Sequence, residues 1–279
     1  MFRNKTVGVS SIASVLIGVA MFGGLAALPL YLQIVKGASP TEAGLLLLPM
    51  TLGIMIGSIV SGQVISRTGR YRMFPIVGSA LLTISLFIFH YVAYDTPLWQ
   101  TMIVMTAFGL GLGFNFQPLT LAVQNAVPQT QIGVATSTAT FTRQIGGTLG
   151  TAVFLSILFS TASEKITTAL AAAVPTQEFQ AALADPTNAA VAEQFAAAQS
   201  GGGAATSVLS DSSFLTGLDE RLAKPFLIGF SEAMDLVFLV GAAVMVFGFL
   251  IMLFLPHVEL RKSASYGERT ADEPEAATR

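Results

Sequence analysis

The chain has 279 residues, of which 53% are hydrophobic and 11% charged, and its mean hydropathy is +0.69. Soluble domains carry about 25% charged residues, so this composition excludes an ordinary soluble protein and indicates an integral membrane protein. The net charge of −2 does not point to a nucleic-acid partner, and the absence of cysteine excludes disulfides and thiolate metal sites. No metal site and no cofactor are predicted.

The first apolar stretch covers residues 7–34 and contains no charged residue. It is longer than the roughly 7–15 apolar residues of a cleaved signal peptide, so we interpret it as a retained membrane-spanning helix. Glycine, serine and proline at residues 37–40 predict a turn. Glu42 then suits the first turn of the next helix.

The second predicted span covers residues 44–65. Gly53, Gly57 and Ser61 are spaced four apart and therefore lie on one face of this helix. Small residues at this spacing allow two helix backbones to approach closely in lipid, so we interpret them as a packing surface. The third predicted span covers residues 73–94 and ends in an aromatic cluster typical of a membrane interface.

The fourth predicted span covers residues 98–124, and its glycines and Pro118 are expected to loosen the helix. The fifth predicted span covers residues 132–159. Its first half is unusually polar and includes Arg143, about a dozen residues into the membrane. A charge at this depth is costly and usually faces a cavity or a partner.

The chain therefore divides into four predicted segments. Residues 1–160 hold five transmembrane helices, and residues 161–225 form a large extracytoplasmic loop with some short helices. Residues 226–256 form the sixth transmembrane helix. The charged residues 257–279 form a disordered cytoplasmic tail.

Basic residues set the expected orientation of these six spans. One side of the membrane collects most of the basic residues of the short loops and ends, whereas the other side has only Lys36. The positive-inside rule therefore puts both termini in the cytoplasm and the large loop outside. The basic residues on the cytoplasmic side are Arg3, Lys5, Arg67, Arg70, Arg72, Arg261 and Lys262.

The loop after the second span carries a recognisable motif, Gly62-Gln-Val-Ile-Ser-Arg67-Thr-Gly69-Arg70-Tyr-Arg72. It resembles the G-x-x-x-D-R-x-G-R-R/K loop that lies between the second and third helices of each six-helix half of the major facilitator superfamily. Serine replaces the aspartate of that motif, which favours the C-terminal half. The five numbered residues are predicted to form a cytoplasmic gating loop; the alternative is that the arginines only determine topology.

Other stretches resemble one branch of that superfamily, the fourteen-spanner drug:proton antiporters of the EmrB/QacA type. Residues 2–4, 29–33 and 43–49 are similar to their ninth and tenth helices. The pattern Arg143-Gln144-x-Gly-Gly-x-x-Gly150 resembles their thirteenth helix. The resemblance implies an all-α membrane protein with six transmembrane helices, arranged as one half (a 3+3 inverted repeat) of the superfamily fold. A matching N-terminal half would complete it in cis or in trans.

The resemblance also implies that the first and fourth helices of this half line the substrate cavity. Polar residues would contact the substrate, and two phenylalanines would form an aromatic wall for a lipophilic drug or metabolite. The alternatives are a structural hydrogen-bonding role for Arg143 and lipid-facing packing for the aromatic rings. The predicted cavity residues are Ser10, Ser14, Phe114, Asn115, Phe116, Gln117, Thr120, Arg143 and Gln144.

The leading hypothesis is a multi-pass transporter of the cell membrane that exports a small molecule in exchange for protons. A non-transporting half that acts as a regulatory or partner subunit is the alternative. An enzyme is disfavoured because the spans contain no nucleophile–base pair or paired carboxylates. The first five spans contain no acidic residue, and Glu232 and Asp235 are interpreted as solvated near the outer interface. The proton site is therefore expected in the N-terminal half.

Overall fold

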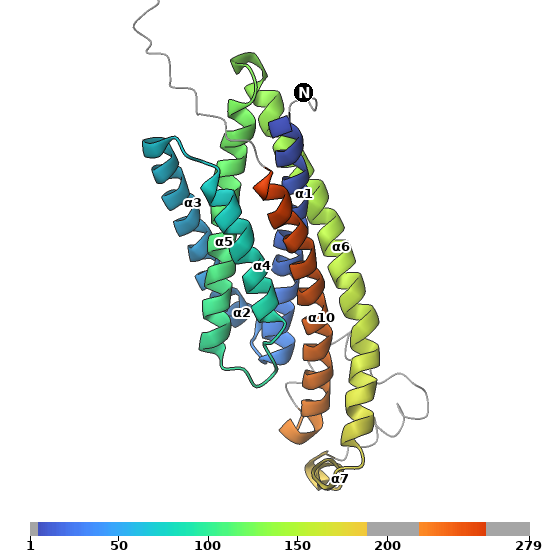
Figure 1. Cartoon of the computed structure of the whole chain (residues 1–279). Helices are drawn as coiled ribbons and strands as arrows, with labels where there is room; N and C mark the ends of the chain where they lie inside the picture. Colours follow the sequence, from blue (N-terminus) through green and yellow to red (C-terminus); the bar gives the residue numbers. More distant parts are fainter. Residues whose placement is uncertain (1–4, 189–217, 255–279) are drawn as a thin grey trace, which may run out of the picture.

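The structure is a computed structural model, and it describes residues 5–188 and 218–254. The predicted tail at residues 257–279, residues 2–4 and much of the predicted large loop lie outside the described residues. Figure 1 shows an elongated bundle of long helices. The helical elements are α1 (Lys5–Leu30), the π-helix η1 (Tyr31–Val35), α2 (Pro40–Leu46), α3 (Leu48–Thr68), α4 (Met73–Phe89), α5 (Leu98–Asn125), the 3-10 turn η2 (Gln129–Gln131), α6 (Ile132–Ala173), α7 (Gln177–Leu183), the 3-10 turn η3 (Pro186–Asn188) and α10 (Glu220–Leu253).

Five helical stretches in the described part of the chain are long and apolar enough to cross a membrane. The remaining apolar helix, α4, has 17 residues and would be about 25 Å long, less than the hydrocarbon core of about 30 Å. The prediction that this helix reaches residue 94 was wrong, because it ends at Phe89. His90 follows it and places its Nδ1 3.0 Å from the backbone carbonyl of Asp235, so the chain turns away there. The spanning stretches are Thr6–Val35, Pro40–Thr68, Leu98–Asn125, Gln129–Ala173 and Glu220–Leu253.

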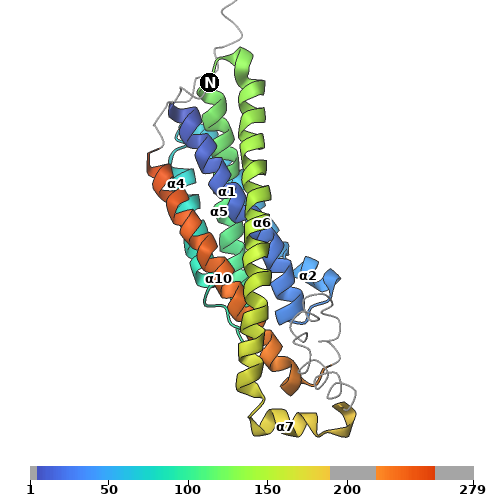
Figure 2. The ribbon, with the colours of Figure 1, turned by 90° about the vertical axis from the view of Figure 1, so that its right-hand side faces the viewer.

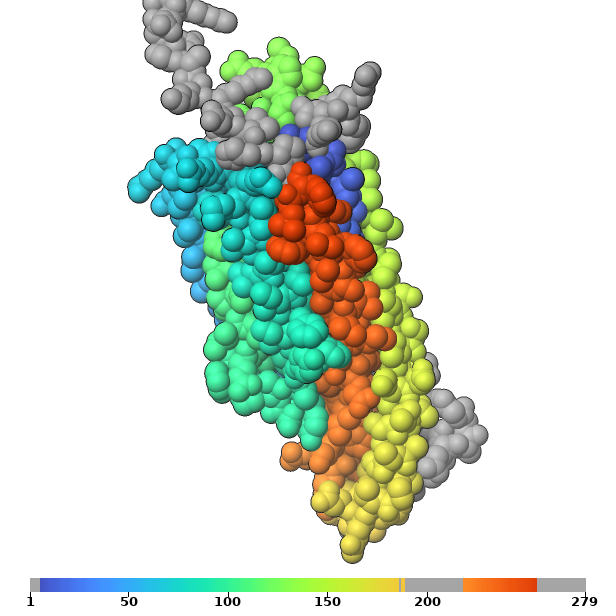
Figure 3. Space-filling view, viewed as in Figure 1, coloured from blue at the N-terminus to red at the C-terminus, as the bar shows by residue number. Residues whose placement is uncertain are grey.

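Helix α1 lies at the centre of the bundle and packs against α6, α10 and α5. Helix α3 lies at one edge and packs mainly against α5, while α4 packs against both α5 and α10. The space-filling view in Figure 3 shows α10 lying between α4 and α6 on one face of the molecule. Large apolar side chains cover the outer faces of α3 and α6, as a lipid-facing surface requires.

Glycines bring α3 and α5 into backbone contact. A Cβ atom on Gly53 would lie 2.5 Å from the Thr106 carbonyl of α5, and one on Gly57 would lie 2.8 Å from the Leu110 carbonyl. Ser61, the third member of this row, is fully buried. The packing interpretation of this face of α3 is therefore confirmed.

Helix α5 is continuous through Pro118, so its glycines and proline do not end the helix, and the expected loosening stays a prediction. The glycines serve close packing. A Cβ atom on Gly109 or Gly113 would overlap the backbone of α3, and one on Gly111 would touch Leu82 of α4.

Two helices extend beyond their predicted ends. Helix α6 continues from the predicted end at residue 159 to Ala173, and α10 begins at Glu220 rather than at residue 226. The extension of α6 is less apolar than a span, but Ala162, Ile166 and Leu170 recur every four residues and are buried. The extension is therefore stabilised by packing of this amphipathic stripe against the bundle, and not by burial of an all-round apolar helix in lipid. Figure 2 shows α7 running across the end of the extended pair.

Candidate functional site

Arg143 lies on α6, about 16 Å from the start of the helix at 1.5 Å per residue. Its side chain is half-buried, and its guanidinium carbon lies 5.0 Å from the centre of the Phe116 ring on α5. A guanidinium over an aromatic face is attracted by the ring quadrupole. Among the described residues no acidic side chain forms a salt bridge with Arg143.

Tight packing between α6 and α1 fixes the position of Arg143. A Cβ atom on Gly18 would lie 2.3 Å from the Arg143 carbonyl oxygen, so at this level the two backbones are in direct contact. Gly146 and Gly150 press in the same way on the carbonyls of Val15 and Val19. The glycines that follow Arg143 in the sequence motif are therefore the contact surface that holds its helix against α1.

Further polar groups line the same junction of α5 and α6. Gln124 Nε2 donates to the Thr136 hydroxyl at 2.9 Å, which joins the end of α5 to the beginning of α6. Thr120, one turn from Phe116, donates its hydroxyl to the Phe116 carbonyl at 2.9 Å. The junction therefore offers a cation, an aromatic ring and hydroxyl groups, which together suit an amphipathic molecule.

The predicted aromatic wall of Phe114 and Phe116 is not formed. Phe114 packs on Phe74 of α4 with ring centroids 5.6 Å apart, whereas Phe116 lies under Arg143 of α6. Residues two apart on a helix point in opposite directions, since each residue turns the helix by about 100°.

Asn115 also belongs to the interface with α4. It is fully buried, its Nδ2 donates to the Gly111 carbonyl at 2.7 Å, and a Cβ atom on Gly78 of α4 would lie 2.5 Å from that nitrogen. Its Oδ1 has no hydrogen-bond partner among the described residues.

The other predicted cavity residues are distributed over several surfaces. Ser10 and Ser14 are buried on α1 at the centre of the bundle. Gln117 and Gln144 are exposed on α5 and α6, and the Gln117 side chain lies toward Gly62 of α3. Of the predicted set, the structure brings together Arg143, Phe116 and the neighbouring Thr120.

Of the predicted gating-loop residues, Gly62 and Arg67 lie in the last turns of α3 rather than in a loop, and the chain turns at Gly69. Gly69 adopts a left-handed conformation with φ of +70°, which favours glycine. Arg72 Nη2 donates to the Leu253 carbonyl in the last turn of α10 at 2.8 Å. An arginine at a helix C-terminus satisfies a free carbonyl and complements the helix dipole. Arg67 and Arg70 are exposed, and the gating role of the loop stays a prediction.

Two acidic residues within α10, Glu232 and Asp235, have different surroundings. Glu232 is exposed and forms a salt bridge with Lys165 of α6 at 3.2 Å. Asp235 is half-buried, and its Oδ1 is enclosed with no hydrogen-bond partner among the described residues. Sequence reasoning therefore missed the burial of Asp235. The signal was available, because Ser231 and Phe238 one turn on either side lie on the buried face of α10.

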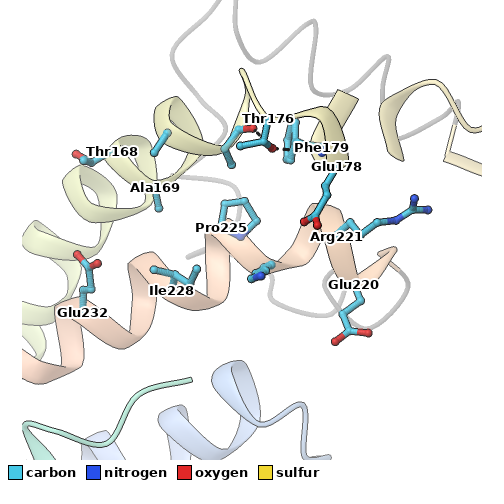
Figure 4. Close-up of a pocket in the computed structure, with 13 residues that line it drawn as sticks. Thr168, Ala169, Thr176, Glu178, Phe179, Glu220, Arg221, Pro225, Ile228 and Glu232 are labelled. Atoms are coloured by element: carbon cyan, nitrogen blue, oxygen red, sulfur yellow. Dashed lines mark hydrogen bonds between the residues drawn. The ribbon is translucent and has the colours of Figure 1, made fainter. Parts of the chain in front are cut away.

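A cavity of about 490 Å³ lies between α6, α7 and α10, beyond the predicted end of the fifth span. Figure 4 shows Glu178 extending from α7 toward α10, with Pro225 and Ile228 along the apolar side. Arg221 on its rim is paired with Asp219, which caps α10. Hydrogen bonds from the Arg221 side chain and backbone hold the pKa of Asp219 well below its ordinary value.

Comparison with known proteins shows which family the chain belongs to. The family model described as Major Facilitator Superfamily matches residues 1–151. The chain belongs to the major facilitator superfamily. It is 34% identical to a tetracycline resistance determinant of Streptomyces rimosus over 98% of this chain and 78% of that protein.

Other members of the superfamily are longer than this chain. It is 32% identical to an uncharacterised MFS-type transporter of Mycobacterium tuberculosis over 93% of this chain, which is 34% of that protein. It is 30% identical to the multidrug transporter protein MdtP of Bacillus subtilis over 54% of this chain and 28% of that protein. This chain thus spans about a third of the length of the Mycobacterium relative. Its relatives and apolar helices identify it as a multi-pass membrane protein of a transporter family.

Proposed function

We propose that this chain is the C-terminal six-helix half of a drug:proton antiporter of the fourteen-spanner EmrB/QacA type, which exports a lipophilic drug or metabolite across the cell membrane. In this proposal α4 is the third span, and an N-terminal half in cis or in trans completes the transporter. The main support is Arg143, which lies over an aromatic ring at membrane depth. It has no acidic partner among the described residues.

A repeated packing device supports the proposed 3+3 repeat. Gly53 and Gly57 of α3 press on α5, and Gly146 and Gly150 of α6 press on α1. The two pairs are related by the same offset along the chain, from 53 to 146 and from 57 to 150. Such a correspondence is expected if α1–α4 and α5–α10 are two copies of one three-helix unit.

The proposed transport pathway runs along the junction of α5 and α6. A half-buried arginine without an acidic neighbour can receive an anionic or hydrogen-bonding group, from the substrate or from the other half. Phe116 and Thr120 add an apolar surface and a hydroxyl beside it. We propose that the termini and the 62–72 loop face the cytoplasm, because the arginines of this loop outweigh the single Lys36 at the opposite end.

Proton coupling requires a group that exchanges a proton within the membrane. Asp235 is the candidate within the described helices, because its Oδ1 is enclosed and unpartnered while Glu232 is paired with Lys165. His90 contacts the backbone of Asp235 from α4, so this carboxyl lies at the α4–α10 contact. The sequence led us to expect the proton site in the N-terminal half, and Asp235 adds a candidate in this half.

The size of the native product tests the proposed half. A C-terminal tag introduced at the chromosomal locus and a blot of the membranes would give this size. We expect a band near twice the calculated 29.2 kDa, or an equal partner that co-purifies. A single band at 29.2 kDa without a co-purifying membrane partner would favour the non-transporting half.

Drug accumulation tests the pathway. The full-length protein would be expressed in a pump-deficient host, with tetracycline and ethidium as probes. We expect Arg143→Ala to abolish export and Arg143→Lys to retain only part of it, since lysine lacks the planar group that stacks on Phe116. Phe141→Leu, two residues away and 65% exposed, is the matched control and should export normally. Full export by a normally inserted Arg143→Ala protein would refute the role of Arg143.

A further inference from the structure

A cleft of about 560 Å³ lies where the end of α3, the motif loop and the start of α4 meet α5. We propose that this cleft binds one anionic phospholipid, with its phosphate at Arg70 and an acyl chain between α3 and α4. The site is separate from the α5–α6 junction and requires only that the protein lies in a membrane. The lining residues are Val64, Thr68, Arg70, Met73, Phe74, Val77 and Phe114.

The lining of the cleft changes from polar to apolar along its length. Arg70 and Thr68 lie at the loop end, where the chain leaves α3. Val77 lies about 6 Å further along α4 than Met73, at 1.5 Å per residue, and Phe114 of α5 lines the same cleft. A phospholipid has the same order of groups, because a charged headgroup is followed by hydrocarbon chains.

Exposed apolar side chains line the opening of the cleft, and two aromatic rings lie in its wall. Val64, Met73 and Val77 are 39%, 65% and 48% exposed, so apolar surface faces outward along the whole opening. The Phe74 and Phe114 rings contact each other with centroids 5.6 Å apart. Helix α3 lies at the edge of the bundle (Figure 1), and it packs mainly on α5, whereas α4 packs on α5 and α10.

The charge at the mouth of the cleft favours an anionic headgroup. Within residues 1–163 the acidic residues are Glu42, in α2 before α3, and Asp95, after the end of α4, so both lie at the ends of α3 and α4 opposite to the cleft. Arg70 forms no salt bridge with any described residue, and Arg67 adds a second exposed positive charge nearby. A lipid phosphate can supply the missing anion, whereas a zwitterionic headgroup brings its own cation.

Tryptophan quenching by brominated lipid tests this site directly. Trp99, the single tryptophan, would be replaced by phenylalanine, and Phe74→Trp would place a reporter in the wall of the cleft. The purified full chain would be reconstituted with brominated phosphatidylglycerol or brominated phosphatidylcholine. A second reporter, Val77→Trp, replaces the first if Phe74→Trp does not fold. We expect phosphatidylglycerol to bind about fivefold more tightly, as about 1 kcal/mol per basic residue implies.

Two arginine variants make the test specific. Arg70→Gln should reduce the preference for phosphatidylglycerol to about one, while Arg67→Gln in the last turn of α3 should retain it. Equal quenching by both lipids in the parent protein would overturn the proposal. An equal loss of preference in both arginine variants would also overturn it, because the attraction would then be diffuse. Quenching needs no substrate, so this outcome and that of the export assay are independent.

Discussion

Replacing Gly146 by alanine should separate α6 from α1. The new Cβ atom would lie 2.1 Å from the Val15 carbonyl oxygen and 2.8 Å from both the Cα and the carbonyl carbon of Val15. All three are backbone atoms, so no side chain can rotate to make room. The helices must move apart, which weakens the packing around Gly18 and Gly150.

The size of the effect follows from comparison with Gly133 on the same helix. A Cβ atom there meets nothing within 4 Å, and Gly133 lies in the first turn of α6, so Gly133→Ala should gain at most the helix propensity of about 1 kcal/mol. Gly146→Ala gains the interior propensity but should lose about 1–3 kcal/mol through overpacking. Because the propensity cancels in part, the difference in unfolding free energy between the two variants is set mainly by the overlap.

Thermal unfolding in detergent, followed by the fluorescence of Trp99, measures this difference. We expect Gly146→Ala to melt about 4–8 °C below Gly133→Ala, if the overlap costs about 2 kcal/mol and each kcal/mol shifts the midpoint by 2–4 °C. Equal midpoints for the two variants would refute the backbone contact between α1 and α6, and with it the proposed positioning of Arg143.

Three other predictions concern the ends of α10 and its buried acid. Arg72→Gln should lower the free energy of unfolding by the value of one charged hydrogen bond to the Leu253 carbonyl, about 1.5–3 kcal/mol; a loss below about 1 kcal/mol would argue against that tether. The folded-state pKa of Asp219 is lowered, chiefly by Arg221, so the ionised carboxylate stabilises the folded state. This contribution is complete above the unfolded pKa of about 3.9 and is lost as the pH falls toward the folded pKa. The midpoint difference between wild type and Asp219→Asn should therefore shrink below about pH 4, and a difference that does not change from pH 7 to pH 3 would contradict this. Asp235→Asn should retain tetracycline exchange at equal pH but lose accumulation driven by a pH gradient; retention of both would exclude Asp235 as the proton-exchanging group.

Local backbone features followed well from the sequence. The row of Gly53, Gly57 and Ser61 predicted a close helix contact, and this contact is present. Glu42 was expected in the first turn of a helix, and it forms a capping box with Ser39 there. These features depend on neighbours within one turn, so a single sequence carries enough information for them.

Features that depend on neighbouring helices were predicted less well. The hydropathy pattern predicts that the fifth span ends near residue 159. Helix α6 continues beyond it because α10 covers its amphipathic stripe. Phe114 and Asn115 looked like cavity residues, yet their partners Phe74 and Gly78 lie on α4. Asp235 looked solvated because of its place near a helix end, whereas its burial follows from packing against α4. The sequence of one helix does not show which other helix packs against each of its faces.

Transport driven by a pH gradient tests the central proposal most directly. Inside-out membrane vesicles containing the full-length protein would be acidified inside and supplied with tetracycline or ethidium. The account predicts uptake that stops when an ionophore removes the pH gradient and that is absent from vesicles with Arg143→Ala. Uptake no greater than that of vector vesicles, with wild-type protein present and correctly inserted, would contradict it.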